Sequence, residues 1–484
     1  MKAQQLHRII GPMLAALIVV IGAINDGQRE LIAMGGIGVW MAYWWITEAV
    51  PMAVTALLPI VFLPLSGIAP AKEVARQYMD SILFLFIGGF ILAFALEKWH
   101  LHKRIALRIL SAVGTKPSRV LLGVMLAAYL ISMWISNTAT VMMLMSAVGA
   151  VVMQMDEHTN DTTAKNKQAA GLFLGLAFAA NIGGMATLVG TPTNMIFYRE
   201  YLRAFPDATD MNFLQWALVG VPISLGLLTA AYFILRNLFC SSTVQNVVSH
   251  DYFRQQLNAL GKWSREEKVV ASVFTVTALL WFTRNDIDLG EIHVSGWSGW
   301  LGEYSKYVDD GTVAIAAAIF LFLFPSSRNG ESIMTWKDAE RLPFDIILLF
   351  GGGFALAFGF EQSGLSVWMA SGFSAMESWP LIAMVAGLAA LICVISEFAS
   401  NVASIQLMIP VLLALAPQIG VTALILLVPA TLAASLGFML PVATAPNTIV
   451  FGSRRIKTTD MMKAGFWIDL IGVALITACC YLLQ

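Results

Sequence analysis

The chain has 484 residues, of which 58% are hydrophobic and 12% are charged, with a formal net charge of −1. Soluble domains carry roughly a quarter charged residues, so this composition indicates an integral membrane protein. The near-neutral charge offers no basic surface for nucleic acid. The long continuous apolar runs exclude a single membrane anchor and a β-barrel, whose strands would alternate over about ten residues.

Apolar segments recur along the whole chain and predict an all-α polytopic fold, with about 11 transmembrane helices and two re-entrant hairpins. The first span is expected to be retained, because no convincing cleavage site follows it. Uninterrupted spans are predicted at residues 9–24, 31–48, 52–69, 81–97, 212–236, 267–284, 312–325, 343–360 and 464–483. Broken apolar segments, typical of hairpins and unwound helices, lie at 120–155, 168–200, 380–417 and 421–452.

Two parts of the chain repeat each other in sequence. Ser81–Glu97 (SILFLFIGGFILAFALE) and Asp345–Glu361 (DIILLFGGGFALAFGFE) are identical at more than half of their positions. The same offset relates the motif SNTAT, which begins at Ser136, to SNVAS, which begins at Ser400. A third pair follows, GTPTN from Gly190 and ATAPN from Ala443. The chain is therefore predicted to contain two structural repeats.

Basic residues indicate how the repeats are oriented. Residues 98–119 are strongly basic, whereas the equivalent residues 361–379 contain Glu361 and Glu377 and no Lys or Arg. Because basic loops stay cytoplasmic, we expect inverted repeats in a bacterial-type inner membrane, with the N-terminus cytoplasmic and the C-terminus external. The predicted divisions are an N-terminal span (1–29), a first repeat (30–200, hairpin 120–155), connecting spans and loops (201–309), a second repeat (310–455, hairpin 380–417) and a C-terminal span (456–484).

Each Ser-Asn motif is a small polar cluster inside an apolar segment. A single cluster could serve only for hydrogen bonding between helices, but two copies in register favour a site at the interface of two repeats. No Lys or Arg lies at the motifs to neutralise an anion, so co-bound cations are expected. The hydroxyls of Ser132 and Ser396, the amide oxygens of Asn137 and Asn401, and loop carbonyls suit a small hard cation such as sodium.

The paired motifs, together with Trp44–Pro51 (WWITEAVP), resemble the divalent anion/sodium symporters, also called sodium/dicarboxylate cotransporters. The resemblance covers nearly the whole chain. It implies a homodimer, each protomer having a scaffold and an elevator-type transport domain, and a substrate resembling succinate, malate or fumarate. It also implies a sodium ion, the co-transported species, beside each hairpin tip, and neither an organic cofactor nor enzymatic activity.

The resemblance also assigns roles to individual residues. The first sodium would be held by Ser132, Ser136, Asn137 and Gly190. The second would be held by Ser396, Ala399, Asn401 and Ala443, with the two alanines acting through their carbonyls. The substrate would lie against Asn137, Thr138, Thr191, Pro192, Asn401, Val402, Thr444 and Ala445.

Several alternatives remain open. Val402 replaces the hydroxyl that Thr138 supplies in the first motif, so citrate and sulfate are alternative substrates, and a sodium-independent di- or tricarboxylate exchanger is an alternative mode of coupling. An anion channel would need a pore lined by basic residues, and an enzyme would need a nucleophile–base or metal constellation; the motifs contain neither. Glu397, whose repeat partner is Met133, is either functional or a structural acid bonded to backbone or to a Ser or Thr.

Overall fold

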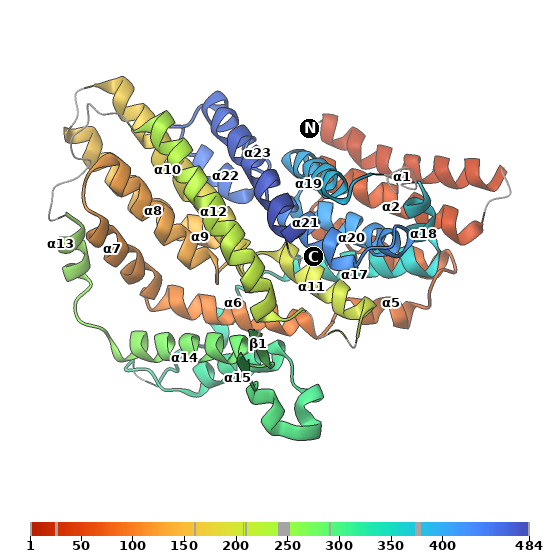
Figure 1. The fold of residues 1–484 in the computed structure, drawn as a ribbon, viewed down its shortest axis with the longest axis horizontal. Coiled ribbons are helices and arrows are strands. Elements are labelled where there is room, and N and C mark those ends of the chain that lie inside the picture. Colours follow the sequence, from red (N-terminus) through yellow and green to blue (C-terminus); the bar gives the residue numbers. More distant parts are fainter. Residues whose placement is uncertain are drawn as a thin grey trace.

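A computed structural model describes residues 2–24, 28–158, 161–206, 208, 211–240, 252–289, 292–328, 330–372 and 379–482 (Figure 1). Glu377, which contributes to the orientation prediction, lies outside these ranges. The described chain is helical, as predicted. The exception is a small antiparallel hairpin between two predicted spans, in which Ile287 pairs with Val294.

The elements follow one another in three groups. The first comprises α1 (Lys2–Ile24), α2 (Arg29–Thr47), α3 (Met52–Thr55), α4 (Leu58–Leu65), α5 (Ala71–Gln77), α6 (Ile82–Lys98), α7 (Leu101–Val113), α8 (Pro117–Ser132), α9 (Asn137–His158), α10 (Thr162–Gly184) and α11 (Pro192–Ala204). The middle group comprises α12 (Phe213–Phe239), α13 (Tyr252–Ala259), α14 (Arg265–Phe282), β1 (Ile287–Leu289), β2 (Ile292–Val294) and the 3-10 helix η1 (Trp297–Tyr307). The last comprises α15 (Asp310–Leu323), α16 (Trp336–Ala339), α17 (Phe344–Gln362), α18 (Leu365–Ser371), α19 (Leu381–Phe398), α20 (Asn401–Gln418), α21 (Ala423–Ala434), α22 (Ala445–Phe451) and α23 (Thr458–Leu482).

Each candidate span predicted from sequence contains a helix, but the span 52–69 is divided into the short helices α3 and α4. In the described part of the chain, eight helical stretches are long and apolar enough to cross a bilayer. Four shorter apolar helices accompany them, at Met52–Leu65, Pro117–Ser132, Asp310–Leu323 and Ala423–Ala434. The structure thus confirms a polytopic helical architecture, while the number of spans remains a prediction.

The four segments predicted to be interrupted are all broken. Residues 133–136 separate α8 from α9, and 399–400 separate α19 from α20. Longer non-helical loops, 185–191 and 435–444, separate α10 from α11 and α21 from α22. Pro192 and Pro446 stand in the first turns of α11 and α22, where a proline lacks no needed hydrogen bond. The order of elements in α6–α11 is therefore repeated in α17–α22.

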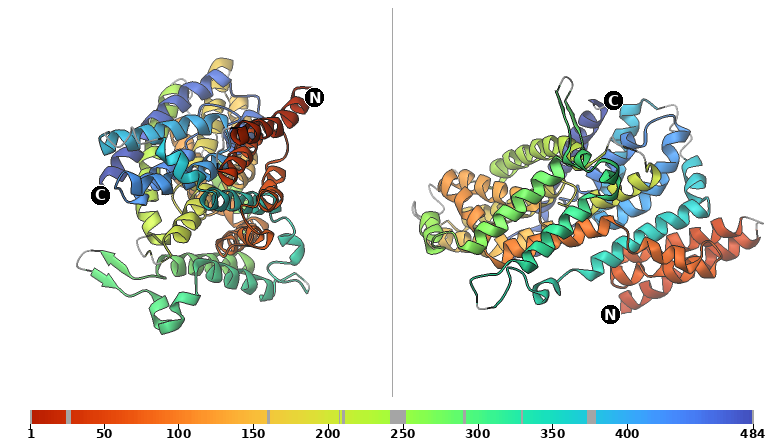
Figure 2. Two further views of the ribbon diagram at one scale, coloured as in Figure 1. Left: turned by 90° about the vertical axis from the view of Figure 1, so that its right-hand side faces the viewer. Right: turned by 90° about the horizontal axis from the view of Figure 1, so that it is seen from below.

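The helices that precede the two long loops form the centre of the molecule. Leu172, Leu176 and Phe178 of α10 are inaccessible to solvent, as are Leu426 and Leu432 of α21. Helices that are apolar on every face are buried on every face. By contrast, α1 and α2 lie side by side at one end of the molecule, and the β1–β2 hairpin projects at its edge (Figure 2). The loop after α10 is buried apart from the half-buried Val189, whereas the loop after α21 is buried at its start and exposes Val442.

Candidate functional site

The first Ser-Asn motif lies at the junction of α8 and α9. Ser132 is the last residue of α8, Asn137 is the first of α9, and the Ser132 hydroxyl lies 2.8 Å from the Asn137 side-chain oxygen. The same terminal atom of the Asn137 amide, which points into the protein, is also 3.2 Å from the Ala180 carbonyl and 3.3 Å from the Gly190 carbonyl. Three of the predicted sodium ligands, Ser132, Asn137 and Gly190, are therefore brought together.

The Asn137 amide has two possible orientations in this pocket, and the surrounding protein groups alone favour the one with its nitrogen inward. With its nitrogen inward, the amide donates to the two carbonyls and to the Ser132 hydroxyl. With its oxygen inward, it accepts from Ser132 and its nitrogen donates to Asn181 Oδ1 at 3.5 Å. In that second orientation the amide oxygen faces two carbonyl oxygens with no hydrogen between them. Such a cluster of oxygens is stable when a cation lies among them.

Glycine allows the backbone to approach this amide. A side chain at Gly184 would overlap the Asn137 amide, and one at Gly190 would overlap the Gly184 carbonyl. The loop at 185–191 can therefore close on Asn137 only if both positions lack a Cβ.

The second motif is arranged in a similar way. The buried Ser396 hydroxyl lies 2.7 Å from Asn401 Oδ1 and 2.6 Å from the Ala434 carbonyl. Asn401 begins α20, and Ala399 has extended backbone between the two helices. A Cβ built on Gly437 would be 3.4 Å from Ala443, 3.6 Å from Thr444 and 3.7 Å from the Ser396 carbonyl. The second loop therefore reaches the second motif.

Each long loop is folded around an asparagine at the end of the third motif. Asn194 Nδ2 donates to the carbonyls of Gly184 and Thr187, at 3.0 and 2.8 Å. Asn447 Nδ2 donates to those of Gly437 and Leu440, at 2.9 and 3.1 Å. Both asparagines are inaccessible to solvent. The same side-chain geometry thus shapes the loop in each half of the site.

The loops are tied to the hairpin tips by different chemistry in the two halves. The Thr187 hydroxyl donates to the carbonyl of Met133. At the equivalent place, the two Glu397 oxygens accept from the backbone N–H groups of Met439 and Leu440, at 2.8 and 3.0 Å. The structure therefore supports the interpretation of Glu397 as a structural acid bonded to backbone.

The remaining predicted residues surround these contacts. Ser136 accepts a hydrogen bond from the Ala139 N–H at 3.3 Å, and with Gly190 and Pro192 it lines a small cavity that also includes Trp134. Thr191 and Thr444 stand at the N-cap positions of α11 and α22, which begin at Pro192 and Ala445; the Thr444 side chain accepts from the Asn447 N–H, whereas the Thr191 side chain makes no such bond. Thr138 is half-buried near the start of α9, and Val402 is half-buried against an apolar cluster that includes Ala403.

The sequence reasoning missed four polar residues of the site. Asn194 and Asn447 stood inside the third motif without a role, although their matching positions were a usable signal. Thr187 and Asn181 had no signal of this kind, because the corresponding residues of the second half are apolar. Asn181 is 2% exposed, and its Nδ2 donates to Thr444 Oγ1 at 3.0 Å.

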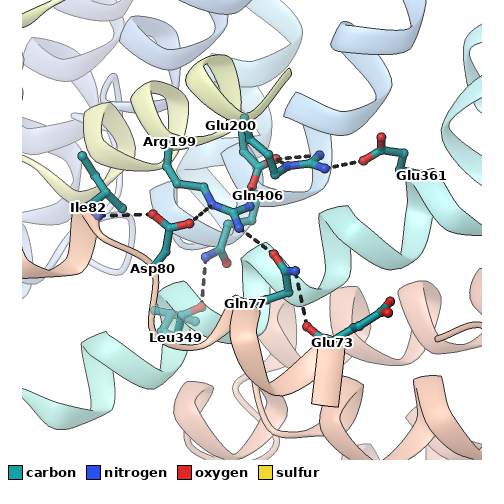
Figure 3. A network of polar contacts seen from close by, with 10 residues as sticks. Glu73, Gln77, Asp80, Ile82, Arg199, Glu200, Leu349, Glu361 and Gln406 are labelled. Atoms are coloured by element: carbon teal, nitrogen blue, oxygen red, sulfur yellow. Dashed lines mark hydrogen bonds and ion pairs between the residues drawn. The ribbon is translucent and has the colours of Figure 1, made fainter. Parts of the chain in front are cut away.

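A buried ionic network holds the far part of α11 (Figure 3). Arg199 bonds Glu200 at 2.5 Å, Asp80 at 3.1 Å and Gln77 at 2.6 Å. Arg203 links Glu200 to Glu361 of α17. Arg199 and Glu200 are 5% and 1% exposed. Because α11 begins at the site, this network fixes the helix that carries Thr191 and Pro192.

The polar contacts of the site are made by neutral groups, apart from Glu397. Within the described residues, no cluster of three or more His, Cys, Asp or Glu side chains could hold a metal ion. The asparagines at the two tips and in the two loops bond to hydroxyls, amides and backbone carbonyls. Such a site favours a weakly bound alkali cation over a tightly held transition metal.

The chain is similar to known proteins over nearly its whole length. Residues 4–482 match the family model described as the sodium:sulfate symporter transmembrane region. The "Sodium-dependent dicarboxylate transporter SdcS" of Staphylococcus saprophyticus is 36% identical over 481 residues, which is 98% of this chain and 90% of the relative. The protein of the same name from Staphylococcus aureus strain USA300 is 36% identical over 484 residues, covering 99% and 91%.

Solved structures of two other transporters share the fold. The structure of Neisseria gonorrhoeae MtrF aligns with a TM-score of 0.57 at 11% identity, covering 84% of this chain and 83% of that one. The structure of Alcanivorax borkumensis YdaH aligns with a TM-score of 0.51 at 14% identity, covering 84% and 85%. At these identities the likeness concerns the fold alone. The family match over nearly the whole chain and the SdcS relatives establish that the chain is not an enzyme and that it belongs to the sodium:sulfate symporter family.

Proposed function

We propose that this protein is a secondary active transporter that couples sodium entry to the uptake of C4-dicarboxylates such as succinate, malate and fumarate. The observation that carries the proposal is the oxygen-lined pocket of Asn137, whose amide faces the carbonyls of Ala180 and Gly190 at 3.2 and 3.3 Å. Relatives that are 36% identical over nearly their whole length are named sodium-dependent dicarboxylate transporters.

Sodium fits the donor set of the first half-site. Ser132, Asn137 and Gly190 supply a hydroxyl, an amide oxygen and a carbonyl. Ser136, which lines a small cavity together with Gly190, is the fourth proposed ligand. A sodium ion among these oxygens would hold the Asn137 amide with its oxygen inward. The Ala180 carbonyl, at 3.2 Å from the amide, is an additional ligand candidate.

The second half-site would hold a second sodium ion. Ser396 and Asn401 supply side-chain oxygens, and Ala399 and Ala443 supply carbonyls. Ala443, Thr444 and the Ser396 carbonyl all lie within 4 Å of a Cβ built on Gly437, so they surround this glycine of the second loop. Two sodium ions would balance the two negative charges of a dicarboxylate in a site whose asparagines have neutral partners.

The substrate would lie between the two halves. Asn137 and Asn401 begin long helices, whose N-termini carry partial positive charge and favour a carboxylate. One carboxylate would meet each half of the site. The proposed contacts are Asn137, Thr138, Thr191, Pro192, Asn401, Val402, Thr444 and Ala445.

We also propose inverted repeats, with the N-terminus cytoplasmic and the C-terminus external. Ion pairs that join the segments predicted to be cytoplasmic support this topology. Lys98 pairs with Asp338 at 2.7 Å and Arg104 with Glu267 at 2.8 Å, so residues 98–119 lie beside the segments around 267 and 338. Arg455 pairs with Asp156 at 2.6 Å, which offsets the acidic residues of the 156–167 loop on the same side.

Alternating access would follow from movement of the unit that contains both motifs and both loops, in an elevator-type mechanism. In this proposal the protein is a homodimer in which the remaining helices form the scaffold. The proposed divisions remain residues 1–29, 30–200, 201–309, 310–455 and 456–484. Cross-linking of cysteine pairs, with one cysteine in the scaffold and one in the moving unit of an otherwise cysteine-free protein, would measure this movement in sodium and in sodium with succinate.

Uptake of labelled succinate into proteoliposomes tests the proposed coupling. The inward gradient would be sodium, potassium or choline, and unlabelled malate, fumarate, citrate and sulfate would serve as competitors. Uptake that requires external sodium supports the symporter. Uptake that ignores sodium but requires internal dicarboxylate would replace the proposal with the exchanger.

The environment of Val402 favours sulfate or citrate as the second candidate substrate. Its side chain is apolar and half-buried, so the second half-site lacks the hydroxyl that Thr138 offers in the first. We predict that Val402→Thr changes the order of competition among succinate, citrate and sulfate and leaves sodium dependence unchanged. An unaltered order of competitors would place Val402 away from the anion.

A further inference from the structure

Asn181 joins the two halves of the site. Its Nδ2 lies 3.0 Å from Thr444 Oγ1 and 3.4 Å from Asn447 Oδ1, both in the second loop. When the Asn137 amide has its oxygen inward, Asn181 Oδ1 also accepts from Asn137 Nδ2 at 3.5 Å, in the first motif. The residue is 2% exposed. A single buried amide therefore contacts the first tip and the second loop at once.

This link is not repeated by symmetry. When the halves are aligned on GTPTN and ATAPN, the residue equivalent to Asn181 is Ala434. Ala434 contributes its backbone carbonyl, which accepts from Ser396 within the second half-site. The connection thus runs through one asparagine of the first half, and packing shared by both repeats does not require it.

We propose that Asn181 is a positioning residue that couples the two cation sites, so that sodium at Asn137 favours the loop arrangement at Thr444 that receives the second sodium and the anion. The inference rests on the proposed sodium coupling and names the residue through which the two sites communicate.

The polarity of the amides supplies the physical mechanism. When the Asn137 oxygen points at the cation, its nitrogen points at Asn181 Oδ1, and the Asn181 nitrogen then points at Thr444. Turning the Asn137 amide would set its oxygen against the Asn181 oxygen. Asn181 could relieve this repulsion only by turning its own amide.

The second loop resists that turn. A turned Asn181 would present its oxygen to Asn447 Oδ1, which now lies 3.4 Å from its nitrogen. Asn447 cannot turn in response without losing its two hydrogen bonds to the carbonyls of Gly437 and Leu440. With its nitrogen inward, the Asn137 amide satisfies the carbonyls of Ala180 and Gly190 but sets its oxygen against the Asn181 oxygen. A cation at Asn137 selects the opposite orientation, in which the amide donates to Asn181. If ligand binding at each of the two sites favours the same orientation of these shared amides, the two ligands bind cooperatively.

Sodium activation of succinate uptake separates this role from simple packing. In wild-type proteoliposomes the dependence of uptake on sodium is expected to be sigmoidal. In Asn181→Ala the Hill coefficient should fall toward one, and the half-saturating sodium concentration should rise about five-fold or more. The matched control is Gln168→Leu, because Gln168 is a fully buried amide on the same helix and lies away from the site. It should retain the wild-type sodium curve.

A double-mutant cycle tests whether the effect passes through Thr444. Thr444→Val removes the hydroxyl that Asn181 contacts and should lower the Hill coefficient in the same direction. The double variant should resemble the more severe single variant, because both substitutions break one link. Additive effects would mean that Asn181 acts by another route and would overturn the proposal.

For variants whose transport is too slow to measure by uptake, sodium binding can be measured instead. Sodium raises the melting temperature of a protein that binds it only when folded. The shift produced by sodium should be smaller in purified Asn181→Ala than in Gln168→Leu, and added succinate should no longer enhance it. An unchanged Hill coefficient and an unchanged sodium shift would contradict the role of Asn181. If the wild-type protein transported succinate without sodium, the proposed function itself would fail.

Discussion

At the scale of single residues, the two halves of the site reach the same geometry with different side chains. Asn194 and Asn447 are equivalent and fold the two loops identically. The connection between loop and tip differs, because Thr187 donates to the Met133 carbonyl while Glu397 accepts from the second loop. The asymmetric residues are therefore where the two halves of the site can differ in their affinity for cation or anion.

Gly184 is the residue whose substitution should affect the first half-site most directly. A Cβ at this position would overlap the Asn137 amide, so Gly184→Ala should abolish sodium-dependent uptake and leave the protein folded. The measurement is uptake per unit of protein that elutes as a single species in size-exclusion chromatography. Gly149→Ala is the control, because that α9 glycine has nothing within 4 Å of an added Cβ. Normal uptake by Gly184→Ala would show that Asn137 does not need its observed position.

Sequence alone identified the tips and loops but not the contacts between them. Ser132, Asn137, Ser396 and Asn401 were recognisable because polar residues in apolar segments repeat at a fixed offset. Asn181 was hidden, since a lone asparagine within an apolar helix is equally consistent with hydrogen bonding between helices. Its role depends on Thr444, which lies far along the chain, and such a pairing is visible only once the helices are packed.

At the scale of elements, α11 connects the site to a buried charge network. The helix begins at Pro192, beside the first tip, and its C-terminal half carries Arg199, Glu200 and Arg203. These side chains reach Gln77 and Asp80 in the α5–α6 region and Glu361 in α17 (Figure 3). The position of the first loop therefore depends on contacts with three other segments.

Removing Arg199 should weaken the whole fold. Arg199→Ala would leave Asp80 and the buried Glu200 without this partner, at a cost of about 3 kcal/mol or more in the free energy of unfolding. Thermal unfolding in detergent measures the loss. The control is Arg341→Ala. Arg341 pairs with Glu97, and their side chains are 54% and 36% exposed, so this ion pair should contribute less than about 1 kcal/mol. Equal melting temperatures for the two variants would mean that the network does not stabilise α11.

The predicted helices agree with the structure where a long apolar segment of the sequence was enough to predict them. Each predicted apolar span contains helix, and each predicted interruption contains a break, but the span 52–69 is also broken, between α3 and α4. The β1–β2 hairpin was not foreseen, because three-residue strands in a polar loop have too few residues to show alternation. The network around Arg199 was also missed, since its partners are brought together only by the tertiary fold.

At the scale of the whole molecule, ion pairs bind one end together. Lys98 reaches Asp338, Arg104 reaches Glu267, and Arg341 reaches Glu97. Arg104 also donates to the Gly261 carbonyl at 3.0 Å. These contacts join the ends of α6 and α7 to the segments that precede α14 and α17, so the basic segments assigned to the cytoplasm lie close together.

Acid should loosen this end of the molecule. Partial burial alone would raise the pKa of Asp338, but hydrogen bonds from Lys98 and Thr335 outweigh it, and the pKa lies below its ordinary value. A carboxyl with a lowered pKa in the folded state stabilises the protein above its unfolded pKa and loses that contribution as the pH falls through the folded value. The melting temperature should therefore fall with decreasing pH below about 4. The fall should be smaller in Asp338→Asn, and identical profiles for the two proteins would contradict the assignment.

In the proposed function, sodium and a dicarboxylate cross the membrane together through the paired motifs. Simultaneous entry of radioactive sodium and labelled succinate into proteoliposomes tests it most directly, with Asn137→Ala and Asn401→Ala as comparison proteins. We expect succinate to drive sodium entry in the wild type, and both fluxes to be lost in each variant while the variants remain folded. Succinate entry with no accompanying sodium, or wild-type fluxes in either variant, would contradict the account.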